Sequence, residues 1–304
     1  MNSAVVSAAH AGTTVRRVVI LGWKGTLTVV RGAIAGAEAY GDHVFVRGGK
    51  VESARIGALA EELDPLTLAR LRSLGIGSSW TCLELAAGTG TVARHLASLC
   101  PRGRVVATDL DVTRLLRDTP PNLTMLRHDV ARESFPEQSF DLVHARYLFC
   151  HLRERDEVLR RVVRWLKPGG WLCVEEPDDS LVASSVNEPH RTVGVGMAAL
   201  LAERIGTDGR WSRRLASMLD SLGLTDIDVS VTGSVVGGRG PMTRFWRLTI
   251  EQLAPEVVER GYASAAQVTE VLAQISDDEF RGHGLSTVSV LARAPIRNLG
   301  KEVS

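Results

Sequence analysis

Three acidic residues, Glu84, Asp109 and Asp129, each end or follow a short apolar run in the middle of the chain. Runs of this kind predict buried strands. Because the carboxyl ends of parallel strands meet at one edge of a sheet, we expect the three carboxylates to gather there. Carboxylates in this arrangement suit a ligand that offers hydroxyl groups, an amino group or positive charge.

The turn after the first of these runs has the spacing of a nucleotide-binding loop. Gly88, Gly90 and Ala93 fit the pattern G-x-G-x-x-G/A, and Asp109 follows about 20 residues later, where a ribose-binding acid is expected. A dinucleotide such as NAD fits this pattern, and so does S-adenosyl-L-methionine. Glu84 favours the second, because a carboxylate facing the turn would repel a pyrophosphate but attract a sulfonium or an ammonium group.

Candidate catalytic groups follow the next expected strands. His144 and His151 titrate near neutrality and are candidate general bases, although packing without a catalytic role is the favoured interpretation for both. Arg146 either anchors an acidic or carbonyl group of a substrate, or pairs with a cofactor carboxylate or a nearby acid. Glu176 either binds an amine or acts as a base, or it caps the following helix.

Aromatic residues in the second half of the chain are candidates for a substrate pocket. Trp211, Phe245 and Trp246 are able to line an apolar pocket for a flat or greasy acceptor. Residues of this kind more often fasten helices to a sheet, and that interpretation is favoured. The sequence predicts no metal site, since the remaining histidines lack ligand spacing.

Strands and helices alternate from Trp80 to Glu175, which is typical of βαβ units and predicts a parallel sheet covered on both faces. The expected strands lie at 80–85, 104–108, 123–127, 140–145, 171–175, 225–236 and 287–292. The expected helices lie at about 92–99, 113–116, 156–166, 192–205 and 211–222, with a helical insert at about 241–280. An insert of this size between the last two strands is well placed to cover an active site.

Two local features qualify this pattern. The apolar spacing from Gly49 to Leu74 is helical, and Pro65 is expected to open a second helix there. The segment Lys167–Gly170 is expected to form a turn at the end of a helix.

Composition and charge exclude several classes of protein. The 304 residues are 44% hydrophobic and 23% charged, with a formal net charge of +1. These values exclude disordered, collagen-like and coiled-coil chains and leave no broad basic face for nucleic acid. No stretch reaches the roughly 18 uncharged apolar residues of a membrane span. The four cysteines contain no CxxC pair, which predicts reduced thiols and a cytoplasmic location.

The N-terminal residues contain one feature that imitates a targeting signal. Arg16 and Arg17 precede an apolar run, as in a twin-arginine export signal, but Trp23, Lys24 and Arg31 interrupt that run. A short peripheral strand or helix, or an upstream extension, is the favoured interpretation.

Five motifs in a fixed order resemble one known family. They are LELAAGTG, VVATDLD, HDV, FDLVHARYLFCHL and LKPGGWLCVEEPD. Together they resemble the class I, Rossmann-like S-adenosyl-L-methionine-dependent methyltransferases, in particular the bacterial small-molecule kind. The resemblance covers about Tyr40 to Pro295 and implies an α/β fold of three layers. Its mostly parallel seven-stranded sheet would have an antiparallel last strand and a helical lid insert.

The resemblance also implies a set of cofactor contacts by motif position. Those at the methionine end are Tyr40, Arg55, Glu84, Ala86, Gly88, Gly90 and Ala145, and those at the nucleoside end are Asp109 for the ribose and Leu110, Asp129 and Val130 for the adenine. The expected organisation is an N-terminal extension at 1–39, a helical cap at 40–79, a cofactor-binding core at 80–176, a C-terminal half at 177–295 with the lid at about 237–282, and a tail at 296–304. The extension has no recognised counterpart in the family.

The expected function is methyl transfer from S-adenosyl-L-methionine to an O, N or C nucleophile of a small organic molecule, such as a secondary metabolite. In-line displacement of this kind depends mainly on positioning. One alternative is an NAD-dependent oxidoreductase. Another is a protein of the same fold that uses the cofactor for binding or cyclisation. A small-molecule acceptor is the expected partner, no nucleic acid or membrane is expected, and a homodimer is the candidate assembly.

Overall fold

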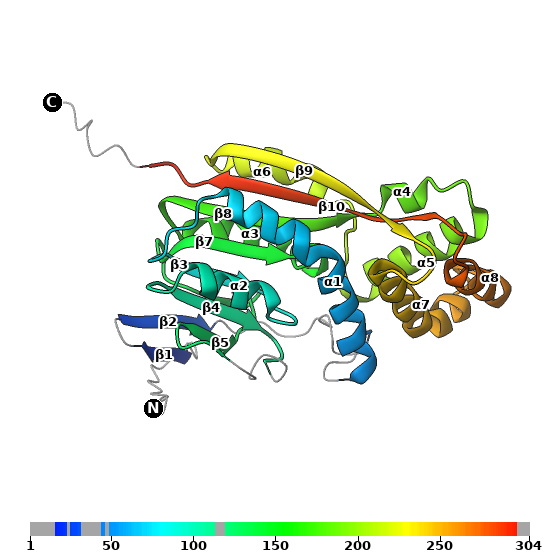
Figure 1. The fold of residues 1–304 in the computed structure, drawn as a ribbon, viewed down its shortest axis with the longest axis horizontal. Coiled ribbons are helices and arrows are strands. Elements are labelled where there is room, and N and C mark those ends of the chain that lie inside the picture. The colour runs from blue at the N-terminus through cyan, green and yellow to red at the C-terminus, as the bar shows by residue number, and fades with distance from the viewer. Residues whose placement is uncertain (1–15, 23–24, 32–43, 46–48, 113–118, 297–304) are drawn as a thin grey trace.

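The computed structural model describes residues 16–22, 25–31, 44–45, 49–112 and 119–296. A seven-stranded sheet with helices on both faces forms the body of the molecule (Figure 1). In spatial order its strands are β5 (Leu123–Arg127), β4 (Arg104–Asp109), β3 (Thr81–Leu85), β7 (Phe140–Arg146), β8 (Leu166–Asp178), β10 (Gly282–Arg293) and β9 (Thr225–Val236). The expected short helix at 113–116 lies outside the described residues, as does Tyr40.

Strand direction confirms the expected fold. β3, β4, β5, β7 and β8 pair in parallel, whereas β10 runs antiparallel to both of its neighbours, β8 and β9. This arrangement is the mostly parallel, Rossmann-like sheet that the alternation of strands and helices predicts. The carboxyl ends of β3, β4, β5 and β7 therefore share one edge.

The helices divide between the sheet faces and one end of the molecule. Their bounds are α1 (Lys50–Ser73), α2 (Thr91–Leu99), α3 (Arg155–Arg164), α4 (Ser180–Ala183), α5 (Glu188–Ile205), α6 (Ser212–Ser221), α7 (Pro241–Glu259) and α8 (Ala265–Ser276), with a 3-10 turn, η1, at Phe149–His151. Figure 1 shows α5, α7 and α8 gathered at one end of the sheet.

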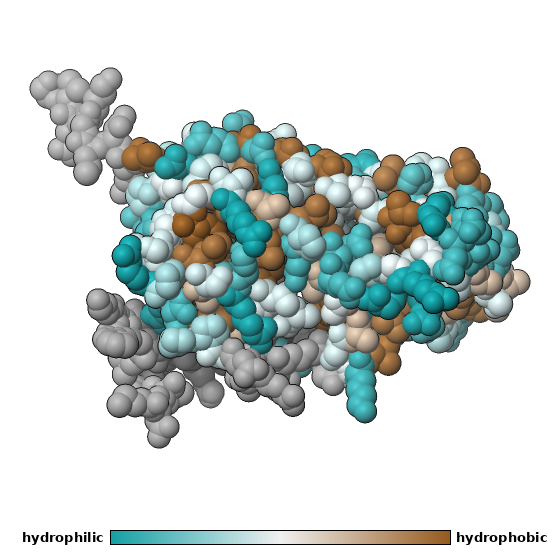
Figure 2. Space-filling view, viewed as in Figure 1, coloured by the Kyte–Doolittle hydropathy of each residue, from teal (hydrophilic) through white to brown (hydrophobic). Residues whose placement is uncertain are grey.

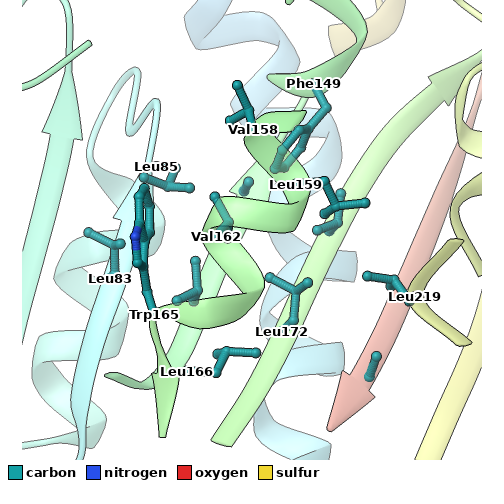
Figure 3. Packing of buried hydrophobic residues seen from close by; sticks show 14 of the residues in the cluster. Leu83, Leu85, Phe149, Val158, Leu159, Val162, Trp165, Leu166, Leu172 and Leu219 are labelled. Atoms are coloured by element: carbon teal, nitrogen blue, oxygen red, sulfur yellow. The ribbon is translucent and has the colours of Figure 1, made fainter. Parts of the chain in front are cut away.

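Alternation of side chains along the strands builds two cores, one on each face. On one face Leu83 and Leu172 pack against α3 and α6, and Figure 3 shows Val162 of α3 among them. On the other face Cys82 and Cys173 pack with α1 and α2. Full burial of each large apolar side chain contributes roughly 1.5–3 kcal/mol, so both helix layers are firmly held on the sheet.

Two local expectations are wrong. α1 is one continuous helix with Pro65 inside it. Leu63 and Thr67 on either side of the proline are both buried, and this packing outweighs the single backbone hydrogen bond that the proline removes. Lys167–Gly170 belongs to β8, because the backbones of Gly169 and Gly170 exchange hydrogen bonds with Ala294 and so extend the sheet.

The N-terminal residues form a small second sheet. β1 (Arg16–Gly22) and β2 (Gly25–Arg31) pair in an antiparallel hairpin. β2 also pairs with β6 (Glu133–Ser134), the short strand that follows β5 in sequence. The peripheral strand was one of the two structures expected for this segment.

The helical insert α7–α8 leaves and rejoins the sheet at adjacent positions, since Val236 of β9 pairs with Gly282 of β10. It packs on α5 and α1 around a third apolar cluster. On the face drawn in Figure 2, hydrophobic residues form separate patches between polar ones. Among the described helices, none has the length and apolar character needed to cross a membrane.

Candidate active site

One cavity of about 610 Å³ extends from the glycine turn after β3 to the helical insert. Its walls come from the carboxyl ends of the strands, from α1 and η1, and from α5 and α7. Ala86 and Tyr147, which both line it, have positive φ angles of 52° and 51°. Non-glycine residues in this region are strained, and such strain is concentrated at functional sites.

Asp109 is held in place by the glycine turn. Its Oδ2 accepts a hydrogen bond from the Gly88 backbone N–H at 2.9 Å, and its Oδ1 accepts one from the Asp111 N–H at 3.0 Å. Burial raises the pKa of the Asp109 carboxyl, and the N–H groups of Asp111, Gly88 and Leu110 partly oppose this shift. Each oxygen retains a second lone pair, so the carboxylate is able to accept from a pair of hydroxyl groups as well.

The nucleoside-side candidates also lie on the cavity wall. Leu110, Asp129 and Val130 line it together with Asp109. Asp129 Oδ1 accepts from the Ala131 backbone N–H at 3.0 Å, which fixes the carboxylate after β5. Ala86 and Gly88 also line the cavity, whereas Gly90 begins α2 as its left-handed N-cap and is not part of the wall.

Glu84 corrects an expectation. Its carboxylate is buried, it is not part of the cavity wall, and its Oε2 lies 2.7 Å from His144 Nδ1. Glu84 belongs to the same strand face as Cys82, the face covered by α1 and α2, so the side chain points into the core. Repulsion between Glu84 and a pyrophosphate therefore does not distinguish the two cofactors.

His144 is likewise a core residue and no base in the cavity. Its Nε2 lies 3.4 Å from Glu175 Oε2, and Thr67 donates to the same oxygen. Burial alone lowers the pKa of His144, but the charge of Glu84 and hydrogen bonds to Cys173, Glu175 and Glu84 raise it well above 6.5. The ring is therefore an imidazolium between two glutamates. Ala145, its neighbour on β7, is buried in the opposite core.

Among the described residues, one group has the spacing of metal ligands. It consists of His144, Cys173 and Glu175, whose potential ligand atoms all lie within 4.8 Å of one another. All three are buried. The hydrogen bond between His144 and Glu175 accounts for the closeness of their side chains without an ion. Hydrogen bonding and the charge of His144 overcome burial and keep the pKa of Glu175 below its usual 4.5. We therefore interpret the cluster as a charge network.

Arg146 lines the cavity but is paired within the protein. Its Nη2 donates to Asp64 Oδ1 and its Nη1 to Thr67 Oγ1, both at 2.8 Å. Of the alternatives expected for this residue, the structure shows the pair with a nearby acid. The pair connects the end of β7 to α1.

His151 lies at the end of η1 and lines the cavity. Its Nδ1 is 3.0 Å from Thr207 Oγ1. Burial, with the charges of Arg55 and Arg155, lowers its pKa to about 3. The imidazole is therefore neutral at physiological pH and is a weak base.

Glu176 has a structural role that differs from both alternatives considered for it, the catalytic or amine-binding group and the cap of the following helix. Its buried carboxylate accepts three backbone hydrogen bonds, from Leu148, Phe149 and Cys150, at 2.8–3.0 Å. Burial raises the pKa of Glu176 to about 7, against these hydrogen bonds. It caps η1 from within the core, not the following helix, and is not on the cavity wall. By fixing η1, it positions His151.

Arg55 lies on the cavity wall next to the insert. Its Nε and Nη2 donate to the two carboxylate oxygens of Glu52, both at 2.8 Å. Its guanidinium lies 3.9 Å from the centre of the Phe45 ring and 5.1 Å from that of Phe245. Arg55 was expected beside the cofactor carboxylate together with Tyr40, which lies outside the described residues.

The aromatic candidates divide into two groups. Phe245 and Trp246 of α7 line the cavity. Trp211 does not, because it is fully buried, stacks on Phe149 and donates from Nε1 to Asp156 at 2.7 Å. Trp211 therefore holds helices against the sheet, as the favoured interpretation predicted.

Sequence reasoning missed several residues of the cavity. Glu52 could have been found, because it lies one helical turn before Arg55 with the spacing of an ion pair. Phe45, Met197 and Leu285 also line the cavity, but they come from distant segments whose meeting no local pattern predicts. The partnership of Arg146 with Asp64 likewise depends on the packing of α1.

A parallel sheet with antiparallel β10, a glycine turn backed by a carboxylate and an insert over the sheet edge define the class I methyltransferase architecture. Residues 83–174 match the family model described as a methyltransferase domain. Over these residues the chain therefore resembles the class I, Rossmann-like S-adenosyl-L-methionine-dependent methyltransferases, and its sheet has the fold of that family.

Relatives and similar structures agree with this family. Methyltransferase str2 of Strobilurus tenacellus is 34% identical over 131 residues, which is 42% of this chain and 47% of the relative. The ubiquinone/menaquinone biosynthesis C-methyltransferase UbiE of Pseudomonas paraeruginosa is 27% identical over 157 residues, 48% of this chain and 60% of the relative. The chain thus spans about half the length of the curated relatives it matches.

A solved structure shows the same fold over most of the chain. It is phosphoethanolamine N-methyltransferase 2 of Haemonchus contortus, in complex with phosphomonomethylethanolamine and S-adenosylhomocysteine. The TM-score is 0.55 at 17% identity, with 96% of this chain and 72% of the other covered.

Proposed function

We propose that this protein transfers the methyl group of S-adenosyl-L-methionine to an O, N or C nucleophile of a small organic molecule. The observation that supports this most directly is the cavity that joins the glycine turn and Asp109 to the apolar wall of the insert. A cavity of this form is able to hold a nucleoside at one end and an acceptor at the other.

The residues at the first end suit S-adenosyl-L-methionine. Asp109 presents a fixed carboxylate for the two ribose hydroxyls, and Leu110 and Val130 provide apolar contacts for an adenine. Asp129 is available to accept from the adenine amino group. Ala86 and Gly88 allow the backbone to approach the methionine portion closely.

The chain's own contribution to the reaction is positioning. S-adenosyl-L-methionine supplies a methyl group on a sulfonium, an electrophile with a good leaving group. The residues at the strand edge hold S-adenosyl-L-methionine, and the insert holds the acceptor in line with its methyl group. Covering the edge with apolar side chains also excludes water from the reacting groups.

Strong general-base catalysis is not part of this proposal. His144 and Glu176 are core residues, and His151 has a pKa lowered to about 3. An acceptor that loses its proton readily, or passes it to water after transfer, is therefore the better match.

The proposal includes a cytoplasmic location. Cys82, Cys100, Cys150 and Cys173 are all buried free thiols. Thiols persist in reducing compartments, whereas secreted proteins tend to form disulfides.

Calorimetric titration with S-adenosylhomocysteine and, separately, with NADH tests the cofactor. We expect binding of the first alone, and weaker binding by more than about 1 kcal/mol in Asp109→Ala, because charge-assisted hydrogen bonds are lost. Asp220→Ala, an exposed carboxylate on α6, is the matched control and should leave affinity unchanged. Tight binding of NADH without S-adenosylhomocysteine would refute the proposal, and unchanged affinity in Asp109→Ala would remove Asp109 from the site.

A further inference from the structure

The last strand in the spatial order of the sheet has an open edge. β9 is a strand of 12 residues and, among the described residues, it pairs with β10 alone. Figure 1 shows β9 along the outer side of the molecule. The open edge of a strand carries N–H and C=O groups that are able to pair with a strand of another chain. Proline and lysine commonly prevent such pairing, and β9 contains neither.

One face of this edge strand is apolar and exposed. Val229, Val231 and Val235 point to the same face because side chains alternate along a strand. All three are exposed, and Val231 is the most exposed of them at 63%. Leu181 of α4 is also exposed and lies beside Gly233 on this face. A long edge strand with exposed apolar side chains is a site of association between chains.

The two acids of β9 are each paired within the chain. Asp228 forms an ion pair with Arg70 of α1, and Asp226 Oδ2 lies 3.6 Å from Arg293 Nη1. Uncompensated charges on an edge strand oppose the approach of a second strand. The two arginines reduce this repulsion, so the acids leave the edge of β9 able to pair.

We propose that two copies of this chain pair through β9 in antiparallel orientation, so that their sheets join into one continuous sheet. A twofold axis at Val231 places this residue opposite its own counterpart, near the middle of the strand. Ile227 then faces Val235 of the second copy. Val229 faces Gly233 of the second copy. Cross-strand pairs of apolar residues on one face stabilise a sheet.

The same register keeps the acids of the two copies apart. Asp226 faces Val236 of the second copy, and Asp228 faces Ser234. A register centred on Asp228 would instead place two carboxylates opposite each other, which is destabilising. β9 is therefore complementary to itself. This property favours a second copy of the chain as the partner, because a twofold interface uses the same surface on both sides.

Sedimentation velocity of the full chain over a range of concentrations tests the dimer. We expect twice the mass of one chain at high concentration. Val231→Lys places two ammonium groups opposite each other at the axis, so the dissociation constant of the dimer should rise at least about tenfold. Val195→Lys changes an exposed valine of α5 and is the matched control, which should keep the wild-type constant. Circular dichroism checks that both variants are folded.

Cross-linking with a short bismaleimide tests the register. The native cysteines that this reagent would otherwise label are all buried. Val231→Cys should give a covalent dimer in high yield, because the two introduced thiols face each other at the axis. Thr225→Cys lies at the end of the strand, where the thiols of the two copies are roughly 40 Å apart, and should give none.

The proposal would be overturned by a monomer at every concentration, by a wild-type dissociation constant in Val231→Lys, or by equal cross-linking of the two cysteine variants. The inference goes beyond the proposed methyltransferase function and does not depend on it. Both tests measure association of the chain with itself, so their failure leaves the proposed reaction untouched.

Discussion

A single imidazolium organises the polar residues beneath α1. His144 lies between Glu84 and Glu175, and Thr67 joins Glu175 to the Arg146–Asp64 pair. Groups from three strands and one helix are thus connected, and His144, both glutamates and Thr67 are buried. Removal of one partner from such a network leaves buried charges without compensation.

We expect His144→Phe to lower the free energy of unfolding by about 3–5 kcal/mol below pH 6.5. The folded pKa of His144 is raised, so its contribution is fully present below its ordinary value of 6.5 and is lost as the pH rises through the raised value. The difference between wild type and variant should therefore shrink in alkaline solution. Urea unfolding across the pH range measures it.

Arg164→Ala is the control for this prediction. Arg164 pairs with Glu137 at the surface, where both side chains are more than half exposed, so its loss should cost no more than about 1 kcal/mol at any pH. A pH-independent effect of His144→Phe would show that the ring stabilises the core by packing alone.

At the scale of residues, the sequence predicts which strand carries a side chain but not always the direction in which the side chain points. Asp109 could be placed by its spacing from the glycine turn, because both features belong to consecutive elements of one βαβ unit. Glu84 could not, because its partner His144 comes from β7, a neighbour of β3 in the sheet but not in the sequence. Periodicity identifies the strand but not the contacts across it.

At the scale of elements, local patterns predicted β9 to the residue, because an alternating strand has a period that no helix shares. They failed at Pro65, where packing on both sides of the residue decides the outcome.

We expect Pro65→Ala to raise the free energy of unfolding by about 1–2 kcal/mol, since alanine restores the backbone donor inside α1. Chemical denaturation measures the gain.

Pro241→Ala provides the contrast. Pro241 is the first residue of α7, after the N-cap Gly240, where proline removes no helical hydrogen bond. Pro241→Ala should therefore leave the free energy of unfolding unchanged. Equal effects at the two positions would mean that Pro65 is not constrained as an interior helical residue.

At the scale of the whole molecule, the apolar residues form three clusters instead of one. Two lie on the faces of the sheet, and the third joins the insert to α5. Regions with separate cores open with separate free energies. We therefore expect the insert to open over the cavity while the sheet stays folded.

We expect native-state hydrogen exchange to be slowest in β7 and at least about tenfold faster in α8. S-adenosylhomocysteine bound in the cavity should slow exchange in α7 and α8 more than in β7. The same exchange rate in both regions would indicate that the insert and the sheet unfold as one unit.

The insert departs after Val236 and returns at Gly282, two residues that face each other across one pair of strands. A different segment joined at these points would leave the alignment of β9 and β10 intact, and with it the carboxyl edge where Asp109 lies. Exchange of the covering segment would therefore alter the lining beneath the insert without moving the glycine turn or Asp109.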